Sequence, residues 1–135
     1  MFRPLALAAL TAAFALPASA QSFQAENDLT VNAVPGGFEV IESGSFGARS
    51  IWCAASDYAQ DVLGVAGTSR LYVLSPRGAA QTAPGRKGVT FTTDASAVSP
   101  VQTLVLGSSI RTPGSNLSVD HSYQFCYDRR LINSR

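Results

Sequence analysis

The sequence predicts an α+β fold, a mainly antiparallel sheet of about six short strands with one packed helix over residues 51–63. Two observations predict it. Most of the chain alternates apolar and polar residues over short stretches separated by Gly- and Pro-rich turns, which is typical of strands. A single stretch has apolar residues at helical spacing instead. A β-sandwich or barrel carrying one helix is the alternative that the same pattern allows.

The expected strands are short and follow one another closely. Pro35, Gly36 and Gly37 predict the turn of a hairpin between the first two strands, because this run of residues favours a tight reversal. Long Gly/Pro-rich connections are expected at 75–88 and 107–116, and 21–27 is expected to be a loose terminus. The strands themselves are expected at residues 29–34, 38–42, 70–74, 89–93, 101–106 and 117–127.

The last expected strand, 117–127, shows the clearest alternation, and it raises a question about Cys126. Cys126 falls on the face opposite the apolar and aromatic row of this strand. Either the helix covers the polar-looking face, or the strand has bulged or ended before Cys126. The row itself comprises Leu117, Val119, His121, Tyr123, Phe125 and Tyr127.

The expected helix has recognisable ends. Ser50 is placed as its N-cap, where a hydroxyl accepts an unpaired backbone N–H. Gly64 stands where a left-handed residue ends a helix. Asp57 and Asp61 are expected on the side opposite the apolar face, which is made of Ile51, Ala55, Tyr58 and Val62.

Residues 1–20 have the pattern of a cleavable export signal. Arg3 precedes an apolar run, Pro17 ends the run, and Ala18-Ser19-Ala20 is a small-x-small cleavage pattern. The run is too short to span a bilayer, and we expect no transmembrane segment elsewhere. Cleavage after Ala20 would leave residues 21–135 of the 135-residue chain as one small domain, periplasmic or secreted.

Charge excludes one class of partner and leaves another open. Without Arg3, the chain has nine basic and nine acidic residues, so nothing favours nucleic acid, whose binding depends on neutralising phosphates. The charges are uneven along the sequence, with a sum of −5 over residues 21–61 and +5 over residues 62–135. The two halves either attract each other within the fold or present a basic face to an acidic partner.

Cys53 and Cys126 are the only cysteines. In an oxidising compartment an even number of cysteines predicts a disulfide, here between the first turn of the helix and the last strand. The alternative is a small hydrolase or thiol enzyme that uses Cys53 or Cys126 with His121. Asp120-His121-Ser122 is not itself a triad, because neighbouring strand residues point to opposite faces.

Other candidate sites are few. One histidine and two oxidised cysteines supply too few ligands for zinc, and no dense acidic loop suits calcium, so we expect no metal and no cofactor. A binding surface is expected at Arg77, Arg86 and Lys87, because binding residues concentrate on loops. Asn116-Leu117-Ser118 matches a glycosylation acceptor.

Several blocks of the sequence resemble small secreted bacterial proteins of unknown function. The resemblance covers roughly residues 38–128 and implies an exported single domain with a helix-to-strand cysteine pair, but no activity. We therefore expect an exported, non-enzymatic domain that binds a protein or a cell-envelope component. The blocks are Ile51–Ala59 with Leu63-Gly64, Arg70–Leu74, Gly85–Thr92 and Phe125–Tyr127.

Overall fold

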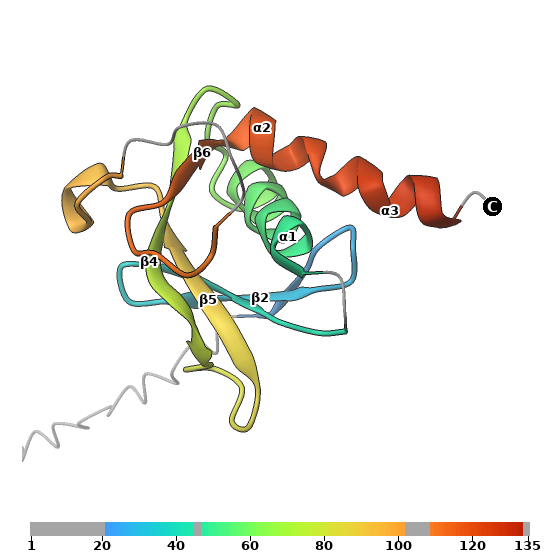
Figure 1. Ribbon diagram of the computed structural model, residues 1–135, viewed down its shortest axis with the longest axis horizontal. Coiled ribbons are helices and arrows are strands. Elements are labelled where there is room, and N and C mark those ends of the chain that lie inside the picture. Colours follow the sequence, from blue (N-terminus) through green and yellow to red (C-terminus); the bar gives the residue numbers. More distant parts are fainter. Residues whose placement is uncertain (1–20, 45–46, 102–108, 134–135) are drawn as a thin grey trace, which may run out of the picture.

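The computed structural model describes residues 21–44, 47–101 and 109–133, and it confirms the α+β fold class. The described strands belong to one antiparallel sheet of order β1-β2-β3-β5-β4-β6 (Figure 1), so the sandwich or barrel alternative is not supported. The strands are β1 (Phe23–Gln24), β2 (Thr30–Val34), β3 (Gly37–Ile41), β4 (Arg70–Ala79), β5 (Lys87–Thr92) and β6 (Asn116–Ser118). The helices are α1 (Gly47–Asp61), α2 (Val119–Gln124) and α3 (Cys126–Asn133), with a 3-10 turn η1 at Ala95–Ala97.

The predicted hairpin joins β2 to β3. Val34 pairs with Gly37, so Pro35 and Gly36 make a two-residue turn, and Gly36 has a φ of +80° that glycine adopts without a steric penalty. Gly37 is needed for another reason, since a Cβ there would lie 2.0 Å from the main-chain oxygen of Phe91. Residues 21–27, expected to be loose, include β1, which pairs with β2.

The predicted helix covered residues 51–63. Helix α1 starts four residues earlier than this prediction and also ends two residues earlier. Ser50 therefore lies inside the helix, and its prediction as the N-cap was wrong. Gly64, with a φ of +64°, has the left-handed conformation expected of it. The nine residues from Ile51 to Ala59 are all buried, because the sheet covers one side of the helix and α2 and α3 cover another.

The apolar core lies between α1 and one face of the sheet. Trp52 of α1 meets the Phe91 ring edge-on, with 4.9 Å between the ring centroids. Tyr58 packs against Phe38 with centroids 4.6 Å apart. Burying such side chains contributes most of the free energy that stabilises a domain. The buried sheet residues facing α1 include Val31, Val40, Leu71, Val73 and Val89.

The expected strand over 117–127 was wrong beyond Ser118. The structure has only the three-residue β6, and the chain then turns into α2 and α3. The physical reason is Ser118, whose Oγ accepts a hydrogen bond from the backbone N–H of His121 at 3.1 Å and so caps a helix. The strand thus ends before Cys126, one of the two arrangements that the alternation had left open.

The other differences concern strand lengths and one segment outside the described residues. β4 runs to Ala79 and β5 starts at Lys87, so the predicted connection 75–88 shrinks to residues 80–86. The predicted strand 101–106 lies outside the described residues except for Val101, which is not in a strand. Within the described ranges, no helix is long and apolar enough to cross a membrane.

Candidate functional site

The predicted disulfide between Cys53 and Cys126 is present, with a Cα–Cα distance of 4.9 Å. Cys126 is the first residue of α3, so the bond joins two helices. The sequence had suggested a bond from a helix to a strand. Both cysteines are almost fully buried. The bond consumes both thiols of the chain and fixes α3 against α1.

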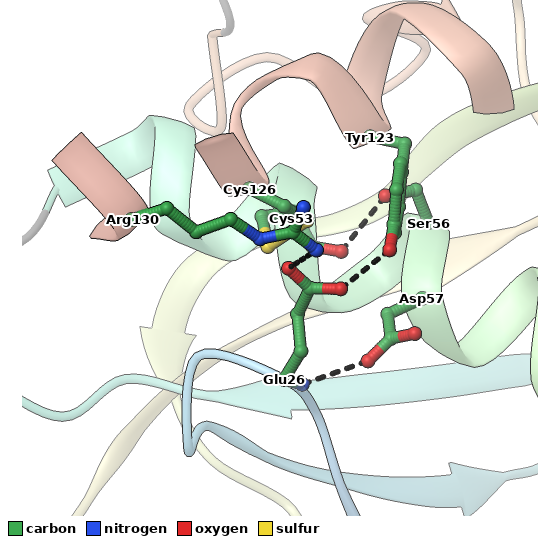
Figure 2. A network of polar contacts seen from close by, with 7 residues as sticks. All are labelled: Glu26, Cys53, Ser56, Asp57, Tyr123, Cys126 and Arg130. Carbon is green, nitrogen blue, oxygen red and sulfur yellow. Dashed lines mark hydrogen bonds and ion pairs between the residues drawn. A yellow bond between two sulfur atoms is a disulfide. The ribbon is translucent and has the colours of Figure 1, made fainter. Parts of the chain in front are cut away.

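Polar contacts around Glu26 hold α2 and α3 beside the disulfide (Figure 2). The Glu26 carboxylate accepts hydrogen bonds from the Tyr123 hydroxyl and from Arg130 Nη2, the second at 3.0 Å. The Glu26 backbone N–H in turn donates to Asp57 Oδ2 of α1 at 2.8 Å. We call the disulfide together with Glu26, Asp57, Tyr123 and Arg130 the C-terminal clasp.

The clasp changes the acidity of two of its members. Hydrogen bonding to the Glu26 carboxylate, burial and the nearby negative charges raise the pKa of Tyr123 to about 12. Burial raises the pKa of Asp57, although the hydrogen bond from the Glu26 backbone opposes this effect. The hydrogen bond from the Glu26 backbone makes Asp57 an anchor for the chain there, and Asp57 is buried whereas Asp61 is exposed.

The three residues predicted as a binding surface come together where β4 ends and β5 begins. We call Arg77, Arg86 and Lys87 the basic tip. Figure 1 shows the connection between β4 and β5 extending from the end of β4 that lies away from α2 and β6. β4 contains ten residues, a length of roughly 30 Å, so the basic tip lies far from the other end of this strand, where Arg70 pairs with Ser118 of β6.

Glu42 organises the basic tip, although no sequence pattern pointed to this residue. Arg77 Nε and Nη2 donate to the two carboxylate oxygens of Glu42, with 2.8 Å between Nη2 and Oε1. Arg86 Nη2 donates to the Glu42 carbonyl oxygen at 2.8 Å. The Glu42 backbone N–H donates to the Lys87 carbonyl at 2.8 Å. One residue of the N-terminal half therefore binds the side chains of Arg77 and Arg86 and the main chain of Lys87.

The basic tip keeps an excess of positive charge. The hydrogen bond from Arg77, together with the charges of Arg77 and Lys87, lowers the pKa of Glu42, so this carboxylate stays ionised. Arg77, Arg86 and Lys87 are all solvent-exposed, and among them the one partly exposed carboxylate of Glu42 pairs with Arg77. A fourth cation, Arg111, is also exposed and follows Ile110, whose carbonyl accepts the Arg77 backbone N–H at 2.9 Å.

A buried carboxylate holds the chain that leads to the basic tip. Glu39 of β3 is 2% exposed. Its oxygens accept the backbone N–H of Gln81 at 2.8 Å, the backbone N–H of Thr82 at 2.9 Å and the Thr82 hydroxyl at 2.7 Å. Gly88 leaves room for it, since a Cβ there would lie 3.1 Å from Glu39 Cγ. Glu39 has no signal in the sequence beyond its place in a predicted strand.

The remaining sequence candidates do not assemble into a reactive site. His121 is exposed on α2 beside Phe125, with 5.6 Å between ring centroids. Asn116, the possible glycosylation acceptor, is 7% exposed and is hydrogen-bonded to Arg70, Val101 and Gly114. In the part of the chain that the structure describes, no group of three His, Cys, Asp or Glu residues could hold a metal ion.

The fold and these sites together define a class, an α+β domain in which a disulfide fixes a C-terminal helix and a hairpin presents gathered cations. Comparisons of the chain with protein-family models, with curated proteins and with solved structures find no match.

Proposed function

We propose that the chain is an exported, non-enzymatic binding domain that works in the periplasm or outside the cell and uses the basic tip to bind an acidic partner protein. The observation that carries the proposal is the position of Glu42, which gathers Arg77, Arg86 and Lys87 on one exposed end of the hairpin. Export is inferred from residues 1–20, and the disulfide is consistent with it.

The disulfide also weighs against the alternative, a small hydrolase or thiol enzyme using Cys53 or Cys126 with His121. A thiolate is the nucleophile in such chemistry, and both sulfur atoms are bonded to each other and buried. Counting free thiols in freshly isolated native protein by alkylation and mass spectrometry separates the two. We expect none, and two would favour the enzyme.

The basic tip has features that favour carboxylate recognition. An arginine offers five N–H donors, so Arg77 and Arg86 retain donors beyond those that Glu42 engages. Because Glu42 and Glu39 already fix the local chain, less conformational entropy is lost when a partner binds. Charge of this kind mainly accelerates association and makes it sensitive to salt.

Lys87 makes a direct test possible because it is the only lysine of the chain. A carbodiimide activates carboxylates and joins them to nearby amines without a spacer, so we expect it to link Lys87 to an Asp or Glu of the partner. The experiment uses tagged protein in cells, followed by mass spectrometry of the linked peptides. Anionic lipid vesicles, tested in parallel for binding, report an envelope surface instead of a protein.

Two variants serve as controls. Lys87→Arg keeps the charge but removes the amine, so it should bind the same partner without forming the link. Arg86→Glu combined with Lys87→Glu reverses the charge and should abolish both binding and linking. The proposal is wrong if the only linked carboxylates are those of this chain, or if the reversed variant still captures the partner.

A further inference from the structure

Gln21 follows the predicted cleavage site, and few contacts fix it to the fold. It is exposed and precedes β1, whose pairing with β2 starts at Phe23 opposite Val31. Among the described residues, none forms a hydrogen bond or an ion pair with the Gln21 side chain. The two residues before Phe23 are therefore free to change conformation without breaking a contact of the sheet.

We propose that the mature protein carries pyroglutamate at position 21, formed by Gln21 itself. This inference rests on the proposed export, since cleavage after Ala20 is what frees the α-amine. The amine nitrogen attacks the side-chain carbonyl carbon Cδ and forms a five-membered lactam. The Cδ–Nε2 bond breaks, and ammonia leaves with the proton that the amine gives up. The reaction needs no oxidant, reductant or other co-reactant.

The surroundings of Gln21 favour the product over the free amine. Gln21 lines an open pocket of about 380 Å³ together with Ser22, Phe23, Ala33, Tyr58 and Val62. The four residues farther along the chain present apolar atoms, and Val62 is 51% exposed. An ammonium group incurs a far larger desolvation cost next to such a surface than a neutral lactam does. The ring can therefore cover apolar surface that the charged terminus leaves open.

Counting reactive amines tests the proposal on the exported protein. Lys87 supplies the only side-chain amine, so an amine-reactive reagent should label the native chain once after cyclisation and twice without it. Intact mass should correspond to residues 21–135 less one molecule of ammonia, with the disulfide intact. The blocked terminus should also resist an aminopeptidase.

Matched variants separate the possible failures. Gln21→Ser cannot cyclise and should take two labels, whereas Gln24→Ser alters a nearby glutamine and should still take one. Two labels with the full mass of residues 21–135, after incubation at neutral pH, would overturn the cyclisation while leaving export in place. A chain that retains residues 1–20, or that starts elsewhere, would overturn the cleavage and the cyclisation together.

Discussion

The basic tip and the C-terminal helix α3 both lie outside the apolar core, yet different chemistry holds each of them. Helix α3 is fixed by a covalent bond from Cys126, supported by the contacts of Glu26 and by an ion pair of 3.0 Å between Arg49 and Asp128. The basic tip has no covalent link. It depends on the buried carboxylate of Glu39 and on the exposed pair of Arg77 with Glu42.

The difference has a physical consequence for what each region contributes to stability. A disulfide acts largely by restricting the unfolded chain, so its contribution is global. A buried carboxylate acts only in the folded state, where losing its hydrogen bonds leaves a desolvated charge. We therefore expect damage to the C-terminal clasp to lower the stability of the whole domain, and damage at Glu39 to loosen the hairpin first.

The largest expected effect comes from reducing the disulfide. The chain-entropy model gives about 4 kcal/mol for a loop closed over a separation of 73 residues. That loss should lower the melting temperature by roughly 15 °C or more. Calorimetry in reductant measures it, once alkylation has shown that the bond is cut. An unchanged melting curve under those conditions would contradict the role assigned to the disulfide.

The comparison also shows which parts of the molecule the sequence could predict. Predicting the disulfide required only the compartment and the number of cysteines, and the pairing of Cys53 with Cys126 was predicted correctly. The roles of Glu39 and Glu26 depend on partners 42 and 97 residues away along the chain. No local pattern carries such information, because the pairing exists only after the sheet and the helices have assembled.

The segment after β6 shows why a correct pattern can be assigned to the wrong structure. Val119, Ser122 and Cys126 are buried and are spaced by three and four residues, which is helical spacing, while the aromatic residues between them alternate. Over so short a stretch, the same residues fit both the helical period and the alternation of a strand. The N-cap Ser118 decides for the helix, and the alternation does not reveal it.

The second largest expected loss of stability comes from replacing Glu39, which holds the chain leading to the basic tip. Glu39→Gln replaces one acceptor oxygen with an amide that faces the donors of Gln81 and Thr82, so we expect a loss of about 2 kcal/mol of stability. Urea denaturation measures the loss. Hydrogen exchange should quicken at the Gln81 and Thr82 amides before it quickens in the core.

Glu42→Gln is the matched control, because Glu42 is the partly exposed carboxylate of the same region. Exposed ion pairs contribute about 0–1 kcal/mol, so this variant should lose less than Glu39→Gln. The reverse order of the two losses would show that the exposed pair, and not the buried carboxylate, holds the basic tip.

The smallest effect concerns the C-terminal clasp at alkaline pH. The pKa of Tyr123 is raised to about 12 in the folded protein, above the usual value of about 10 for an unfolded chain. The stabilisation linked to this proton is fully present below pH ~10 and is lost as pH rises through the folded value. We expect the midpoint of urea unfolding to fall across that window.

Glu26→Gln tests the cause, because the Glu26 carboxylate is the main reason for the raised pKa. In this variant the pKa of Tyr123 should fall towards its ordinary value, and the alkaline loss of stability should shrink. Tyrosinate absorbance follows the titration, and subtracting the curve of a Tyr123→Phe variant isolates Tyr123 from the other three tyrosines of the chain. A Tyr123 titration identical in the native chain and in Glu26→Gln would mean that Glu26 does not hold the Tyr123 hydroxyl, so other contacts would hold α2 in place.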